Sequence, residues 1–175
     1  MTLSNASRMK LIAAEAPRLM RYARALLRDR QDAEDLVHDC IVRALANLAN
    51  WRDGESPRKW LFTIMHNIHI DHVRSKSRRP LLLPLDDWDQ PGSTIHAAAE
   101  VNVTGPEIEQ AVAALPIEQR QCVLLVGLEG LSYAATAEVL GVPVGTVMSR
   151  LSRGREKLRQ RLDPGFERPA LRRIK

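Results

Sequence analysis

Cysteines are few in this 175-residue sequence, and long apolar runs are missing. The two cysteines, Cys40 and Cys122, lie far apart in apolar helical patterns, which argues against a paired metal or redox motif and favours buried free thiols. No apolar run approaches the roughly 20 residues that a membrane-spanning helix needs, and the N-terminus lacks the apolar core of a signal peptide. We therefore expect a cytoplasmic protein without membrane insertion.

Positive charge is also missing from one long interval, although the formal net charge of the chain is +5. No Lys or Arg occurs between Arg79 and Arg120. The interval carries acidic residues instead, among them Asp86, Asp87, Asp89, Glu100, Glu107 and Glu109. An acidic stretch between two basic regions indicates parts with different partners, and the net positive charge favours an anionic partner.

Helical periodicity on both sides of this stretch predicts an all-α fold of two small helical domains joined by an acidic flexible linker. In the first domain, residues 1–79, we expect helices over 7–27, 32–47 and 57–74, with Pro17 dividing the first. Residues 80–105 contain three prolines and two glycines, which predicts the linker. The second domain, residues 106–163, is expected to hold four helices, and a basic tail, residues 164–175, follows.

The stretch 131–162 combines a helix-turn-helix pattern with dense positive charge. Ser132 can cap a helix that stops at Gly141, and Pro143 suits the first turn of the next helix. On that next helix Val147 and Leu151 lie four apart and are expected to pack inward. The remaining surface carries the cations Arg150, Arg153, Arg155, Lys157, Arg159 and Arg161. This arrangement predicts a DNA-binding element that contacts phosphates and base edges in the major groove.

The helix expected over 32–47 has a buried and an exposed side. Asp32 can cap it, and its predicted apolar stripe consists of Leu36, Val37, Cys40, Ile41, Ala44, Leu45 and Leu48. Asp35, Asp39 and Arg43, spaced by four, share the other side and are available to a partner. The polar segment 47–56, which contains Gly54, is expected to be a loop.

Three segments together carry a resemblance to a known family. DAEDLVHDCIVRAL (Asp32–Leu45), WLFTIMHNIHIDHVR (Trp60–Arg74) and GTVMSRLSRGREKLR (Gly145–Arg159) occur in the order and spacing typical of that family. The chain resembles an extracytoplasmic-function sigma factor of bacterial RNA polymerase. The resemblance implies a protein that is not an enzyme, needs no cofactor, and has core RNA polymerase, promoter DNA and an anti-sigma factor as partners.

The resemblance also assigns roles to the first domain. Asp35, Asp39 and Arg43 would dock on the largest polymerase subunit, and the acidic linker would thread the RNA-exit path. The following residues would contact the promoter near the minus-ten element: Asn50, Trp51, Arg52, Asn67, Arg74, Arg78 and Arg79. Trp51 could stack on a flipped base or, equally, plug the core beside a helix end.

In the second domain, the resemblance implies that the helix-turn-helix reads the minus-thirty-five element. Ser149 and Arg153 share a flank that is expected to meet base edges. Arg150, Arg155 and Thr146 are expected to hold phosphates. Two residues of this domain depart from the family pattern: Met148 stands where a basic residue is frequent, and Gly154 where alanine is usual, at a cost of about 1 kcal/mol in helix propensity. In the first domain His38 and Cys40 depart from it, where glutamine and a small or aliphatic residue are common.

Two other functions remain open at this point. A stand-alone helix-turn-helix regulator would bind duplex DNA without polymerase. A metal-dependent helical enzyme could use the Asp35/His38 pair together with His66, His69 and His72. That metal pattern is incomplete, because no second acid-x-x-His pair follows and His66 and His72 point well apart on a helix.

Overall fold

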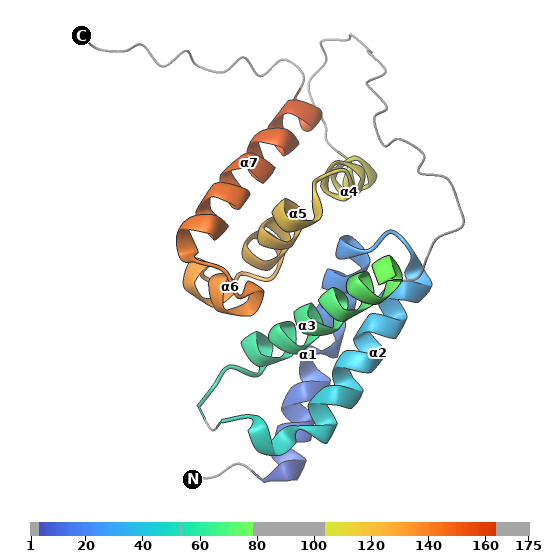
Figure 1. Cartoon of the computed structure of the whole chain (residues 1–175), viewed down its shortest axis with the longest axis vertical. Coiled ribbons are helices and arrows are strands. Elements are labelled where there is room, and N and C mark those ends of the chain that lie inside the picture. The colour runs from blue at the N-terminus through green and yellow to red at the C-terminus, as the bar shows by residue number, and fades with distance from the viewer. Residues whose placement is uncertain (1–3, 53, 79–103, 164–175) are drawn as a thin grey trace, which may run out of the picture.

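The structure, a computed structural model, describes residues 4–52, 54–78 and 104–163. These residues form helices and no strand, which confirms the predicted all-α fold (Figure 1). The first helical group comprises α1 (Asn5–Leu26), α2 (Arg30–Ala46), the 3₁₀ turn η1 (Leu48–Asn50) and α3 (Pro57–Arg78). The second helical group comprises α4 (Gly105–Ala113), α5 (Ile117–Val123), the π-helical segment η2 (Leu124–Leu128), α6 (Tyr133–Leu140) and α7 (Val144–Leu162). The predicted linker, apart from its last two residues, and the predicted basic tail lie outside the described residues.

Helix α1 runs without a break through Pro17, contrary to the expected division at this residue. A proline inside a helix removes one backbone hydrogen bond and crowds the preceding turn. Ile12 and Leu19, before and after the proline, are both 1% exposed in the same core. Their packing holds the two halves of α1 in one helix, and Pro17 itself stays exposed.

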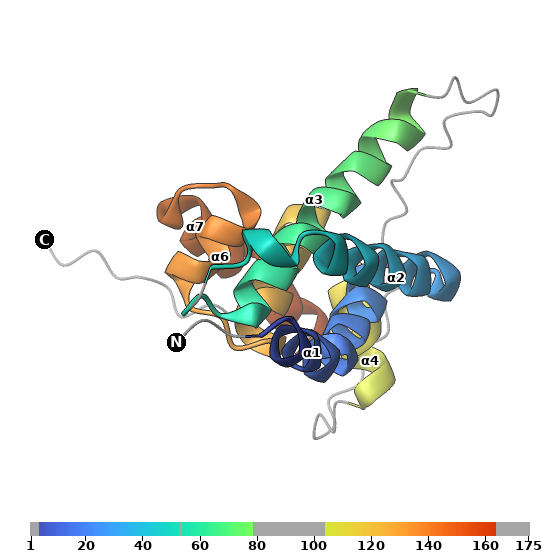
Figure 2. The ribbon, with the colours of Figure 1, turned by 90° about the horizontal axis from the view of Figure 1, so that it is seen from below.

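Helix α2 begins two residues before its predicted start. Asp29, not Asp32, is the cap, because its carboxylate accepts a hydrogen bond from the backbone N–H of Asp32 at 2.8 Å. The stripe of α2 faces α1 and α3 as predicted, except that Leu45 is exposed. Val73 of α3 is exposed as well. Figure 2 shows why: the last turns of α3 project beyond the other helices.

The second group packs α7 closely against α5. A Cβ atom added at Gly154 of α7 would lie 2.8 Å from Cγ2 of Val123. Gly154 is buried, and α7 continues past it to Leu162. The glycine therefore lets two helix backbones approach, and this packing offsets its expected cost in helix propensity.

The two groups also pack against each other, which the separation by a linker did not predict. Buried apolar side chains of both groups form one continuous cluster. Helix α3 packs along α6, and α1 contacts η2 and α4 (Figures 1 and 2). Arg120 of α5 joins the groups by donating hydrogen bonds to the carbonyl oxygens of Leu26, at the end of α1, and of Leu115. We call this the packed arrangement.

Candidate nucleic-acid interface

The helix-turn-helix forms as the sequence predicts. The Ser132 hydroxyl accepts a hydrogen bond from the N–H of Ala135 at 3.1 Å and caps α6. Gly141 ends α6 in the left-handed conformation, with φ of 63°, which costs a glycine little. Val147 and Leu151 of α7 are buried at 0% and 2% exposure. The turn and this apolar face together fix which side of α7 remains at the surface.

Most of the predicted DNA contacts of α7 lie on that surface. Ser149, Arg153 and Arg155 are exposed, and Thr146 is half-buried. The Ser149 hydroxyl donates to the carbonyl oxygen of Thr146 at 3.0 Å. Within the described residues Arg153 and Arg155 form no ion pair. Their guanidinium groups can therefore meet an anion without breaking an internal contact.

Arg150 differs from the other cations of this face. It is half-buried, and its positive charge acts on His66 of α3 across the contact between the groups. Burial, followed by this charge, lowers the pKa of His66 below its ordinary value. In the packed arrangement Arg150 therefore lies close enough to the first group for its charge to act there, and it is less exposed to a DNA phosphate than Arg153 and Arg155.

The predicted partner-binding residues of α2 are exposed at the contact between α2 and α3. Asp39 lies 3.5 Å from Nε2 of His72, and Arg43 lies 3.8 Å from the carboxylate of Asp71. Asp35 accepts a hydrogen bond from Gln31 one turn earlier. Pairs this exposed contribute little to stability. The side chains can therefore be given up to a partner at small cost.

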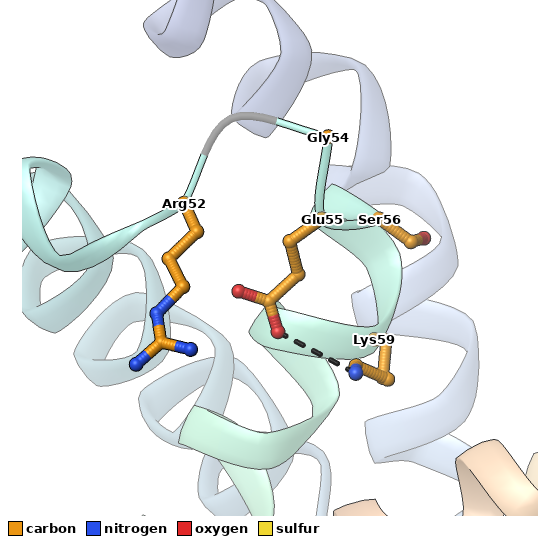
Figure 3. Close-up of a pocket in the computed structure, with 5 residues that line it drawn as sticks. All are labelled: Arg52, Gly54, Glu55, Ser56 and Lys59. Atoms are coloured by element: carbon orange, nitrogen blue, oxygen red, sulfur yellow. Dashed lines mark ion pairs between the residues drawn. The ribbon is translucent and has the colours of Figure 1, made fainter.

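The loop between η1 and α3 forms a pocket of about 510 Å³, shown in Figure 3. Arg52, Gly54, Glu55, Ser56 and Lys59 line it. Gly54 has φ of 88°, a left-handed conformation that favours glycine. Of these five residues, only Arg52 was predicted as a site residue. Lys59 and Glu55 were not predicted as site residues, because polar residues are ordinary on the exposed side of the first turn of a helix.

Trp51, predicted beside Arg52 as a possible base-stacking surface, is buried at 3% exposure. Its ring stacks on Trp60 at 5.7 Å with an interplanar angle of 14°, and its Nε1 donates to the carbonyl oxygen of Glu55 at 3.0 Å. The guanidinium of Arg8 lies 5.9 Å from the ring centre and donates to Leu48 O at 2.8 Å. The structure thus uses Trp51 as a core plug that shapes the pocket, and stacking on a base would require it to leave this site.

The other predicted downstream contacts have different surroundings. Asn50 is exposed on η1, and its side-chain amide donates to Asn47 at 3.2 Å. Asn67 and Arg74 are exposed on α3. Arg78 is the last residue of α3, and Arg79 lies outside the described residues. Asn67 and Arg74 therefore lie along α3, apart from the pocket lining.

The four histidines within the described ranges do not gather into one site. His66 faces Gln121 of α5 at 3.5 Å, whereas His72 faces Asp39 of α2. His69 is buried, and His38 is exposed on α2. No group of three or more potential metal ligands occurs among the described residues. Cys40 and Cys122 are buried free thiols, as predicted, and burial raises the pKa of both.

One buried ion pair between the groups could not be predicted from the sequence. The side chain of Glu129, which follows η2, is fully buried, and its Oε1 accepts hydrogen bonds from Arg21 of α1 at 2.8 and 3.1 Å. Residues 108 positions apart cannot be paired by periodicity. The pair nevertheless matters for stability, because a carboxylate that is buried without its cation raises the free energy of the folded chain.

Comparisons with known proteins cover both groups. The family described as Sigma-70 region 2 matches residues 11–79, and that described as Sigma-70, region 4 matches residues 106–158. The ECF RNA polymerase sigma factor EcfG of Rhodopseudomonas palustris is 35% identical over 90% of this chain and 86% of its own length. SigM of Mycobacterium tuberculosis is 34% identical over 80% of this chain and 69% of its own.

A solved structure agrees with these matches. The sigma factor RpoE of Bartonella quintana, determined in complex with the anti-sigma factor NepR, has a TM-score of 0.73 and 28% identity, over 89% of this chain and 96% of that chain. No helix among the described residues has the length and apolar character to cross a membrane. With both helical groups matched and a relative aligned over most of both chains, the protein belongs to the extracytoplasmic-function (ECF) family of RNA polymerase sigma factors.

Proposed function

We propose that the two helical groups divide promoter recognition between them, with residues 106–163 reading the upstream element and residues 1–79 binding core polymerase and the downstream element. The observation that carries this proposal is the exposed cationic face of α7, with Arg153 and Arg155 outside and Val147 and Leu151 buried behind them. The match of the first group to sigma region 2 favours this division over a stand-alone helix-turn-helix regulator.

At the upstream element, Arg153 and Ser149 contact base edges, and Arg155, Thr146 and Arg150 contact phosphates. The exposure of Arg153 and Arg155 supports their part in this division. Arginine presents two parallel donors that match the major-groove edge of guanine, whereas a phosphate contact carries no sequence information. Arg150 joins the contacts after the groups separate.

At the downstream element, the pocket beside Arg52 receives a base taken out of the stack. Its volume of about 510 Å³ lies in the range of small-molecule sites, and a flipped base needs such a pocket. Asn50, Asn67, Arg74, Arg78 and Arg79 contribute further contacts to the downstream DNA, those of Asn67 and Arg74 along α3. Trp51 supports the pocket wall from behind rather than stacking on the base.

The partners follow from the same division. Asp35, Asp39 and Arg43 on the exposed side of α2 dock on core RNA polymerase, in the cytoplasm. An anti-sigma factor holds the chain inactive until it is released. The similar sigma factor of Bartonella quintana, whose structure was determined with an anti-sigma factor, supports that regulation.

Run-off transcription with purified core polymerase tests the proposed function. We expect this chain to direct initiation from specific start sites on genomic DNA fragments, and core enzyme alone to give none. The variant Asp35→Lys/Asp39→Lys is the matched comparison, because both residues are exposed and it should keep its helical circular dichroism while competing poorly for core enzyme. Specific duplex binding by the chain alone, with no polymerase-dependent transcription, would contradict the proposal.

A further inference from the structure

Lys59 lies where the pocket of the first group meets the second group. Its ammonium is 3.6 Å from the carboxylate of Glu55, on the pocket wall, and 2.6 Å from that of Glu138, on α6. Figure 3 shows Lys59 and Glu55 on the same side of the pocket, joined by their ion pair. Neither Lys59 nor Glu138 belongs to the predicted DNA contacts. The ion pair with Glu138 therefore ties a pocket residue to the helix-turn-helix.

This contact determines which partners Lys59 has. In the packed arrangement the ammonium of Lys59 lies between two carboxylates, those of Glu55 and Glu138. When α6 moves away, Glu138 leaves with it and Lys59 keeps one carboxylate partner. A cation that loses an acidic partner at a concave site is available to the phosphates of a nucleic acid.

We propose that Lys59 contacts the backbone of single-stranded promoter DNA at this pocket, and that Glu138 occupies the same ammonium in the packed arrangement. The proposal rests on the proposed function, because it adds one contact to the downstream site. An ammonium binds a phosphate as a compact point charge, and it cannot hold Glu138 at 2.6 Å and a phosphate in the same direction at once. DNA binding at the pocket and packing of α6 against α3 therefore oppose each other.

The spacing of the two promoter elements requires α6 to move away from α3. Elements centred near positions minus thirty-five and minus ten lie roughly 85 Å apart on duplex DNA, at about 3.4 Å per base pair. From covalent geometry alone, the 26 peptide steps between Arg78 and Thr104 span at most roughly 90 Å. The chain can thus place the groups on both elements, but α6 must then leave Lys59.

The test measures binding of the full-length chain to a fluorescein-labelled 20-nucleotide single strand of randomised sequence, by anisotropy at low salt. We expect Glu138→Gln to tighten binding about two- to fivefold, because loss of an exposed ion pair changes an equilibrium constant by about that factor. Lys59→Gln should weaken binding by a similar factor, and Lys59→Arg should retain it. The double variant Lys59→Gln/Glu138→Gln should bind like Lys59→Gln, because Glu138 acts through Lys59.

The matched control is Glu118→Gln, which removes the same charge from an exposed position of the second group on α5. Tightening by Glu118→Gln equal to that by Glu138→Gln would overturn the proposal, as would tightening by Glu138→Gln that persists without Lys59. Circular dichroism checks that each variant keeps its helices. Failure of the proposed function would appear separately, as loss of specific run-off transcription by the unchanged chain with core polymerase.

Discussion

The two helical groups present their candidate DNA contacts in different ways. In the second group the contacts follow one face of α7, and the opposite face is buried through Val147 and Leu151. In the first group the pocket is built by a loop, and the aromatic side chain at the centre of that loop, Trp51, is buried. A helix separates its binding face from its packing face by its period, whereas a loop has no period and each side chain is positioned by its neighbours.

This difference has a consequence for substitutions. Arg153 and Arg155 on the outer face of α7 can be replaced without disturbing the fold, because both are exposed and form no ion pair within the described residues. Trp51 of the loop cannot, because the shape and the stability of the loop both depend on it. Substitutions in both groups and at the contact that joins them test this contrast, with expected effects that decrease from Trp51 to His66.

Trp51→Ala should give the largest effect. It removes a buried ring, its stack on Trp60, its hydrogen bond to Glu55 and its contact with Arg8. We expect the first group to lose about 3 to 5 kcal/mol of unfolding free energy, measured by urea denaturation followed by circular dichroism. Unchanged stability with lost permanganate reactivity of the melted promoter would instead restore the base-stacking role of Trp51.

Arg21→Ala should separate the groups. If Glu129 stayed buried without its cation, the cost would be about 3 to 5 kcal/mol, and the chain can avoid that cost by exposing Glu129 to water. We expect a larger radius of gyration in small-angle scattering with unchanged helical circular dichroism. Arg18→Ala is the control, because Arg18 pairs with Glu15 within α1. An equally compact Arg21→Ala variant would mean that apolar packing alone holds the groups together.

Arg153→Ala and Arg155→Ala should weaken promoter binding in different ways. Loss of Arg153 should cost roughly 1 to 3 kcal/mol at the preferred upstream element and narrow the gap to a scrambled sequence. Loss of Arg155 should weaken both sequences alike and lower the salt dependence by about one phosphate contact. Both are measured with holoenzyme at the same salt and downstream element. Equal losses on both DNAs for Arg153→Ala would make it a phosphate contact.

His66 should give the smallest effect, a pH dependence of the packed arrangement. Facing it from the second group are Gln121 and Arg150. Burial, and then the charge of Arg150, lowers the pKa of His66 from its ordinary value of 6.5, so packing favours the neutral ring. The contribution of His66 to packing is therefore retained above about pH 6.5 and lost as pH falls below it toward the lowered pKa.

Scattering across this pH range measures the effect. We expect the compact form to be less populated at about pH 5.5 than at pH 7.5 in the unchanged chain. His66→Gln should remove this part of the dependence, because glutamine does not titrate. The prediction is contradicted if the His66→Gln variant opens over the same range as the unchanged chain.

The amino-acid sequence by itself determined the helices, the turn and the anchored face of α7. Ser132, Gly141 and the pair Val147 and Leu151 act within one or two turns of the chain, so their effects can be read from spacing. The exposed sides of α2 and α7 follow from the same periodicity. The three family segments added the predicted roles, because they occur in a fixed order along both groups.

Only the tertiary structure decided how residues far apart in the chain meet. It placed Trp51 in the core, brought the charge of Arg150 near His66, and kept α1 whole across Pro17. It also showed that Gly154 lies against Val123, where a larger side chain would clash. It also paired Arg21 with Glu129 and Lys59 with Glu138. Each of these outcomes depends on a neighbour from another element, and local propensity carries no information about such a neighbour.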